Sequence, residues 1–318
     1  MTARLSTDGP HRVAVGPRHP LSSLVEIDVD ARSHAGYHRA KNEDHFFVTR
    51  LSRTLQTMIT SLPAEDVPAL AEEVNYVMVV ADGMGGHAAG ELASRMAISA
   101  LVGLALEVPD WIFKVDEEHA PEIEQRSRNY VQEVGAMLVE RGRRDAALHG
   151  MGTTLTVVRS LGRDLLITHV GDSRAYLLRG GGLHRLTRDH TFAQLLVDSG
   201  LAPGDVAVSR HRHVLTNALG GTIADVQVDT DRLQLEDGDR LLLCSDGLTD
   251  LVDDATIAGL LRETTRSSDA CDRLVQRALD SGGRDNVTVI VAAYRLPNEP
   301  ARAADVGSNE GDTEVGLA

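Results

Sequence analysis

Aromatic side chains, cysteines and long apolar runs are scarce in this sequence. Aromatic residues make up 3% of the 318 residues, against a hydrophobic share of 42%, so the core must be mainly aliphatic. The two cysteines, Cys244 and Cys271, are too few for a disulfide framework and form no CxxC metal site, so we expect buried thiols in a reducing compartment. No apolar run reaches the roughly 18 residues that span a bilayer, and residues 1–20 lack the apolar core of a secretory signal. We therefore predict a cytoplasmic protein without a membrane partner.

Positive charge is also in short supply. The chain has 47 acidic residues against 32 Lys and Arg, which gives a formal net charge of -15. Because nucleic acids and anionic membranes attract basic surfaces, this balance argues against both as partners.

The two ends of the chain differ from the middle. Residues 1–23 are rich in Pro, Gly, Ser and Arg, and residues 296–318 scatter acidic residues among Gly, Ala and Ser. Neither segment has the apolar periodicity of a folded element, so we predict two disordered tails. Residues 24–295 are predicted to form the folded domain.

Runs of strands separated by helices follow along that domain. Alternating or continuous apolar patterns predict strands at 25–31, 45–49, 77–81, 154–160, 165–170, 174–178, 241–244 and 287–293. Helical periodicity predicts helices at 89–108, 120–142, 191–199, 254–263 and 268–281. We expect residues 51–75, with Pro63 and Pro68, to be a helical or irregular insertion, and residues 200–225 to be rich in loops. Several consecutive strands favour an α+β fold over a regular βαβ alternation.

The stretch from Val77 to Glu91 combines a buried strand, an aspartate and several glycines. The strand is followed by Asp82, then by Gly83, Gly85 and Gly86, and then by the long predicted helix. The glycines could belong to a dinucleotide-binding fingerprint. Asp82 disfavours that reading, because its charge would repel a pyrophosphate, and the helix leaves no early second strand to bind the ribose. An accessible carboxylate at a strand end is the preferred interpretation.

Carboxylates recur at the ends of other predicted strands. A single aspartate in such a place is most often a turn former or a helix cap. Five strand ends that carry carboxylates beside Gly or Asn would repel one another if they converged, unless cations were bound there. Oxygen ligands without His or Cys partners suit hard ions such as Mg²⁺ or Mn²⁺, and two such ions can activate a water against a phosphoryl group. The residues are Glu43, Asp44, Asp82, Asp172, Asp246 and Asp285.

Seven short motifs together resemble the metal-dependent serine/threonine protein phosphatases of type 2C, the PPM family, and its bacterial members in particular. The resemblance extends from about Val25 to Tyr294, and each motif is weak alone but specific in this order. The motifs are Arg39-x-x-Asn42-Glu43-Asp44, Asp82-Gly83-Met84-Gly85-Gly86, Gly152-Thr153-Thr154, Gly171-Asp172-Ser173-Arg174, Leu186-Thr187-x-Asp189-His190, Ser245-Asp246-Gly247-Leu248-x-Asp250 and Asp285-Asn286-Val287-Thr288.

The resemblance implies a binuclear centre of Mn²⁺ or Mg²⁺. Asp82 would bridge two metals, and the backbone carbonyl of Gly83 would ligate the first. Asp246 and Asp285 would hold the second. Asp172, together with Asp246, would offer the third metal position that bacterial members have.

Three further residues complete the site that the resemblance implies. Glu43 and Asp44 would act mainly through metal-bound waters and hydrogen bonds. Arg39 would bind the substrate phosphate, for which the guanidinium fork is suited. Arg39, Asp82 and Asp246 are thus the predicted catalytic residues, and the alternative for Arg39 is a plain surface arginine.

Met84 departs from the pattern of many eukaryotic members, which have a histidine there that is proposed as the general acid. Methionine cannot donate a proton, so the leaving group must take its proton from a metal-bound water or another group. His87 is a candidate, although a histidine that opens a helix is more often a capping or surface residue. We assign the loop histidines to the surface for the same reason; they are His34, His38, His190, His211 and His213.

The implied fold is an α-β-β-α sandwich of two mostly antiparallel sheets flanked by helical pairs, with residues 200–225 as a flap beside the metals. The implied reaction is hydrolysis of phosphoserine and phosphothreonine in proteins by a metal-activated water, with no phospho-enzyme intermediate. The partners would be protein substrates of a serine/threonine kinase, and we expect a monomer. The alternative is a non-catalytic regulator that keeps the fold, which the presence of all three metal aspartates disfavours.

Overall fold

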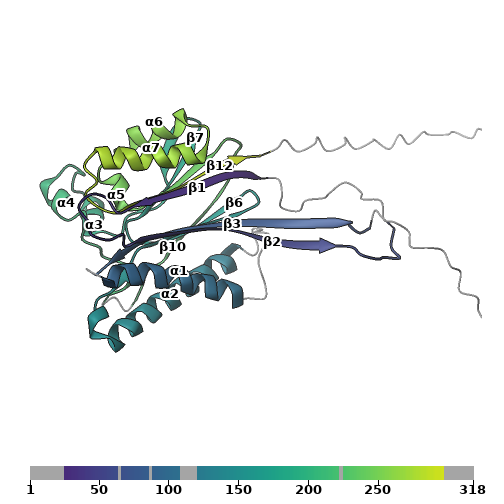
Figure 1. Ribbon diagram of the computed structural model, residues 1–318, viewed down its shortest axis with the longest axis horizontal. Coiled ribbons are helices and arrows are strands. Elements are labelled where there is room, and N and C mark those ends of the chain that lie inside the picture. The colour runs from purple at the N-terminus through teal and green to yellow at the C-terminus, as the bar shows by residue number, and fades with distance from the viewer. Residues whose placement is uncertain (1–24, 64–65, 86–87, 108–119, 222–224, 297–318) are drawn as a thin grey trace, which may run out of the picture.

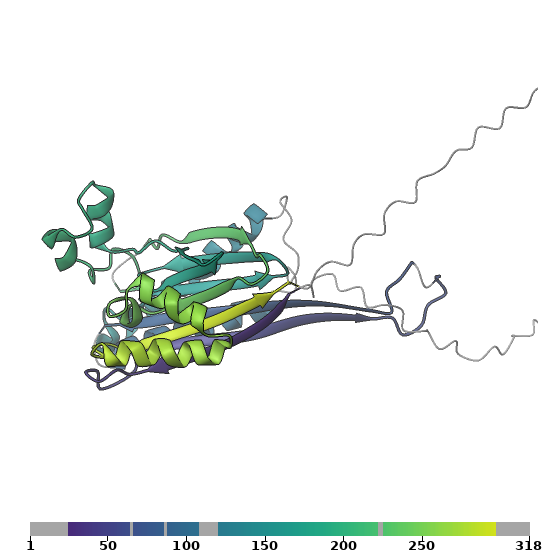
Figure 2. The same ribbon diagram turned by 90° about the horizontal axis from the view of Figure 1, so that it is seen from above.

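The computed structural model describes residues 25–63, 66–85, 88–107, 120–221 and 225–296 (Figures 1 and 2). Nearly all of the two predicted tails, and His87, lie outside these ranges. Leu296, which we placed at the start of the second tail, is buried against the core. No helix within the described ranges has both the length and the apolarity needed to cross a bilayer.

Two antiparallel sheets form the centre of the molecule. One has the order β1–β12–β11–β7–β8, and the other has the order β10–β6–β5–β3–β4–β9, with β2 paired to β3. The first sheet consists of β1 (Glu26–His34), β12 (Val287–Arg295), β11 (Arg240–Cys244), β7 (Arg174–Arg179) and β8 (Gly182–Arg185). The second consists of β10 (Asp229–Gln234), β6 (Asp164–Val170), β5 (Leu155–Leu161), β3 (Leu70–Met84), β4 (Gly152–Thr153), β9 (Leu219–Gly220) and β2 (Asp44–Gln56).

Helices cover the outer faces of both sheets (Figure 1). The pair α1 (Ala88–Glu107) and α2 (Ala120–Arg144) lies on the β3 sheet, and α6 (Asp254–Glu263) and α7 (Ser267–Asp280) lie on the β12 sheet. The short elements are η1 (Ala146–Leu148), α3 (Phe192–Asp198), α4 (Val206–Arg210) and α5 (Asp246–Thr249). The predicted α-β-β-α sandwich is therefore confirmed.

Aliphatic side chains form three apolar layers, in line with the scarcity of aromatics. The middle layer, between the sheets, contains Val80, Leu243 and Ile290. The alternation of β-strands sends the neighbouring side chains outward, so Val79 packs under α1 and α2 while Val289 packs under α7. Cys244 and Cys271 are buried free thiols, as predicted.

The prediction for residues 51–75 is wrong. Instead of a helical or irregular insertion, β2 continues to Gln56 and pairs with β3 from Leu70 onward, which makes a long hairpin that extends beyond the sandwich (Figure 2). Pro63 and Pro68 do not interrupt it, because both lie in the connecting loop, where no ladder hydrogen bond is needed.

Candidate metal centre

The β2–β3 register places two of the predicted carboxylates side by side. Asp44 lies directly opposite Asp82 in the antiparallel ladder. The main chain of Asp82 is fixed by the next motif in the chain, since its N–H donates to Thr154 Oγ1 at 2.9 Å and its carbonyl accepts from Thr153 Oγ1 at 2.8 Å. The Gly-Thr-Thr motif thus supports the position of Asp82 rather than reacting.

Asn286 holds the segment that carries the other N-terminal site residues. Its Nδ2 donates to the carbonyls of Ala35 and Lys41, both at 2.9 Å, and its Oδ1 accepts from the Glu43 N–H at 2.7 Å. These contacts join residues about 240 positions apart in sequence, because β1 and β12 are neighbours in one sheet. Asn286 therefore positions Glu43 next to the start of β12, where Asp285 lies.

Asp44 is almost completely buried and has one oxygen without a partner. Its Oδ2 accepts from Ser245 Oγ at 2.7 Å, whereas Oδ1 has no hydrogen-bond partner among the described residues. Burial raises the pKa of Asp44 to about 7, hydrogen bonds from Ser245 and Thr288 oppose the rise, and the charges of Asp246 and Asp285 add to it. A buried anionic oxygen with no donor is a place where a cation or its water would be stabilised.

Asp82 and Asp172 lie in the same like-charged environment. Burial raises the pKa of Asp82 well above its usual range, and the charges of Asp44, Asp246, Asp172 and Asp285 raise it further. Burial likewise raises the pKa of Asp172, with Asp246 the strongest charged neighbour. The predicted strand ends therefore do converge, and Asp246 acts on the pKa of each of the other buried aspartates.

Two glycines permit this convergence. A Cβ on Gly83 would lie 2.2 Å from the carbonyl oxygen of Gly90 at the start of α1, and a Cβ on Gly247 would lie 1.9 Å from the carbonyl oxygen of Asn286. Any side chain would therefore push Asp82 or Asp246 away from its neighbours. The close packing brings α1 against the Asp82 turn and α5 against the start of β12.

Arg39 supplies the nearest positive charge at the rim of the cluster. Its Nη2 donates to Asp285 Oδ2 at 2.6 Å, and both side chains remain partly exposed. The hydrogen bond with Asp285 raises the pKa of Arg39. Burial raises the pKa of Glu43, an effect that the charge of Arg39 reduces. One guanidinium cannot neutralise the set of carboxylates behind it.

A second pair of motifs holds the loop of Asp172. Arg174 donates from Nε and Nη2 to the carboxylate of Asp189, at 2.9 and 2.7 Å. The N–H of His190 donates to the Gly171 carbonyl at 2.7 Å, and the Gly171 N–H donates to His190 Nδ1 at 3.1 Å. These contacts give the Asp189-His190 motif a supporting role beside the site.

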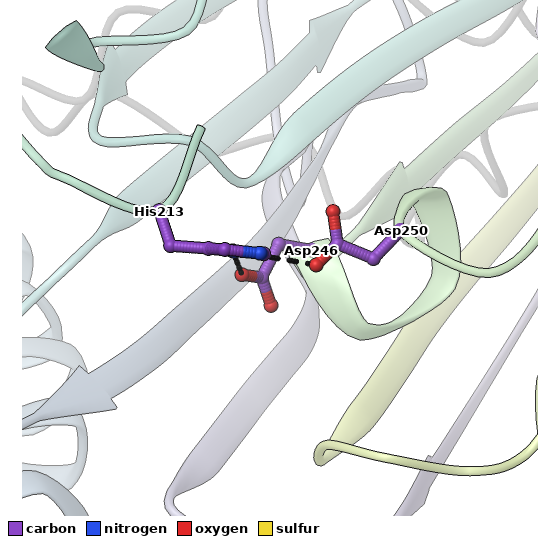
Figure 3. A group of neighbouring side chains, drawn as sticks. All are labelled: His213, Asp246 and Asp250. Carbon is purple, nitrogen blue, oxygen red and sulfur yellow. Dashed lines mark ion pairs between the residues drawn. The ribbon is translucent and has the colours of Figure 1, made fainter. Parts of the chain in front are cut away.

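His213 and Asp250 were missing from the predicted site. His213 Nδ1 lies 3.4 Å from Asp250 Oδ2 and 3.7 Å from Asp246 Oδ2, as Figure 3 shows. The nearby carboxylates of Asp246 and Asp250 raise the pKa of His213. Asp250 could have been found, because it follows Asp246 by four residues and so shares its side of a helical turn. His213 has no such local signal, since it comes from the predicted flap.

The donor set fits hard divalent cations. The converging groups are carboxylates and backbone carbonyls, which suit Mg²⁺ and Mn²⁺. The unpartnered oxygen of Asp44 and the raised pKa values of Asp82 and Asp172 both indicate anionic charge that the described residues leave uncompensated. Asp82, Gly83, Asp246 and Asp285 could hold two ions, and Asp172 could contribute to a third.

Comparisons with known proteins agree with this site. Residues 58–281 match the family model described as protein phosphatase 2C. The serine/threonine protein phosphatase PstP of Mycobacterium tuberculosis is 40% identical over 219 residues, which are 68% of this chain and 40% of that protein. The serine/threonine phosphatase stp of Listeria monocytogenes is 37% identical over 221 residues, 69% of this chain and 85% of that protein.

Solved structures show the same likeness. The catalytic domain of PstP in complex with two manganese ions has a TM-score of 0.66 and 34% sequence identity, and the match covers 85% of this chain and 99% of that one. The family match covers more than two thirds of the sequence, and the converging carboxylates lie in the motifs on which the resemblance was based. This chain belongs to the protein phosphatase 2C family.

Proposed function

We propose that this protein is a metal-dependent phosphatase that hydrolyses phosphoserine and phosphothreonine in proteins. The observation that carries the proposal is the convergence of Asp44, Asp82, Asp172 and Asp246, with an unpartnered oxygen on Asp44 and raised pKa values for the buried members. The family membership and the two manganese ions of the PstP catalytic domain support it.

The roles of the residues in this proposal follow their places in the site. Asp82 and the Gly83 carbonyl would hold one cation, and Asp82, Asp246 and Asp285 would hold the second. When bound, such cations supply a water of lowered pKa as the nucleophile and neutralise phosphoryl charge. Glu43 and Asp44 would accept hydrogen bonds from the water around the ions.

Arg39 binds the substrate phosphate from the rim. Its hydrogen bond with Asp285 keeps the guanidinium beside the site, and its exposed fraction of 55% leaves donors free for phosphate oxygens. Met84 takes no part in proton transfer, because its thioether has no proton to donate. Its side chain packs against Gly152, where a Cβ would meet Met84 Cε at 2.6 Å.

The proposal also covers the wider setting of the enzyme. We infer that residues 24–295 form the catalytic domain, that its substrates are phosphoproteins made by a serine/threonine kinase, and that it acts as a monomer in the cytoplasm. The acidic net charge supports protein substrates over nucleic acids.

Hydrolysis of a phosphothreonine peptide, measured with Mn²⁺ and then with EDTA, tests the function. We expect turnover in Mn²⁺ that EDTA abolishes and added Mn²⁺ restores. An absence of metal-dependent turnover, with peptide binding retained, would instead support the non-catalytic regulator.

A further inference from the structure

An apolar pocket lies between the β3 sheet and the α1–α2 pair, on the outer face of the sheet. Its volume is about 230 Å³, and apolar side chains of both the sheet and the helices form most of its wall, among them Val77, Ile98 and Leu101. Val77 lies five residues before Asp82 on β3, about 16 Å along an extended strand. The pocket is thus separate from the metal centre.

Arg159 places an uncompensated positive charge at this pocket. It lies on β5, two residues from Val157, and therefore on the face of the strand that packs against the helices. Burial lowers the pKa of Arg159, the hydroxyl of Tyr130 opposes this, and the charge of Arg126 adds to it. Among the described residues Arg159 has no hydrogen bond or ion pair, and no carboxylate is near enough to affect its pKa.

The other polar side chains that line the pocket are either positively charged or neutral. Arg126 also lines the pocket, and its Nη2 is bound to Glu122 at 2.9 Å. The hydroxyl groups of Ser127, Tyr130 and Thr168 are neutral donors beside it. No described acidic side chain lines the pocket, so the partly buried guanidinium of Arg159 faces an apolar space with no described anion to pair with.

We propose that this pocket binds an apolar monocarboxylic acid, with its carboxylate on Arg159 and its hydrocarbon tail among the aliphatic side chains of β3 and α1. A guanidinium matches a carboxylate with two parallel hydrogen bonds. The space of about 230 Å³ accommodates a short alkyl chain. An anion of higher charge would leave its second charge against the apolar wall.

Isothermal titration of the full chain with sodium octanoate tests the proposal, with octanamide as the neutral ligand of equal length. We expect saturable binding of one octanoate, at least tenfold weaker in Arg159→Met, while octanamide affinity changes less than twofold. Arg141→Met is the matched control, because Arg141 is exposed on α2 and does not line the pocket. It should bind octanoate as the wild type does.

A second measurement does not depend on a variant that folds. In methyl-labelled protein, intermolecular NOEs should connect octanoate to the methyl groups of Ile98 and Leu101. The proposal is overturned by the absence of saturable binding, which would also result if another part of the chain filled the pocket. Equal octanoate affinity in Arg159→Met, or NOEs to other methyl groups only, would overturn it too. Each of these outcomes leaves the proposed hydrolysis unaffected.

Discussion

The Arg159 pocket lies on one sheet, whereas the carboxylate centre takes side chains from strand ends of both sheets, and the two sites differ in how their charge is held. At the centre, several anions converge, and neighbours such as Asn286 and Thr153 fix the backbone around them. At the pocket, the guanidinium of Arg159 lies among mainly apolar side chains and has no described partner. The comparison suggests that the centre is built to bind ions in a fixed geometry, whereas the pocket selects a ligand mainly by charge and apolar fit.

Removing Asp246, whose charge acts on the other aspartates of the centre, should have the largest effect, and that effect is on turnover. We expect Asp246→Ala to lower metal-dependent turnover by about a thousandfold or more, or about 4 kcal/mol, because a metal ligand is lost. Metal-free stability should not fall, since Asp246 raises the pKa of each buried aspartate by repulsion. Peptide kinetics in Mn²⁺ and denaturation in EDTA check both parts. Turnover like that of the wild type would refute the assigned role.

The second largest effect should be the pH dependence of the stability of the metal-free protein. Because the folded pKa of Asp44 is about 7 and its ordinary value is 3.8, the folded state binds the proton more tightly. This contribution is fully present below about pH 4 and is lost as the pH rises through 7. Between pH 5 and pH 8 it amounts to about 1–3 kcal/mol.

Urea denaturation in EDTA at several pH values measures this change. The difference between the wild type and Asp44→Asn isolates the contribution of Asp44 from that of other titrating groups. If the two proteins lose stability in parallel between pH 5 and pH 8, Asp44 does not have the raised pKa.

Replacing Arg159 should have a smaller effect. It should raise the free energy of unfolding, whereas most core substitutions lower it. We expect Arg159→Met to gain about 1 kcal/mol in stability or less, because it removes an unpaired, partly buried charge and keeps the apolar contacts. Urea denaturation without added ligand measures it, with Arg141→Met as the control. A loss of similar size would show that the guanidinium is already compensated.

Replacing His213, at the edge of the carboxylate centre, should have the smallest effect, which is on kcat/KM. His213 is 53% exposed and touches Asp246 and Asp250 only from the flap. We expect His213→Ala to reduce kcat/KM by about two- to fivefold, less than 1 kcal/mol, with metal dependence retained. A hundredfold loss would show that His213 acts directly on substrate or metal.

The sequence allowed much of the fold and of the centre to be predicted. Asp82, Asp172 and Asp246 each stand at the end of an apolar strand beside glycine, so local pattern and motif order were sufficient to group them. Pro63 and Pro68 hide the long hairpin in the sequence, because they suggest a break in the whole segment, whereas the β2–β3 ladder continues to the pair Gln56 and Leu70.

Other features depend on contacts that no local pattern reports. His213 reaches Asp246 only because the predicted flap carries it to the start of α5, and Arg159 is a single arginine in a mostly apolar strand. Charge that is compensated by neighbours and charge that is left uncompensated look the same in a sequence. The two are distinguished only when packing shows which groups lie near each residue.

Direct measurement of metal binding tests the central claim, that the converging aspartates hold divalent cations. Equilibrium dialysis of the metal-free protein against Mn²⁺ should show at least two ions per chain, with at least one lost in Asp82→Asn and Arg159→Met unchanged. Binding of equal stoichiometry and affinity in the wild type and Asp82→Asn would contradict the account.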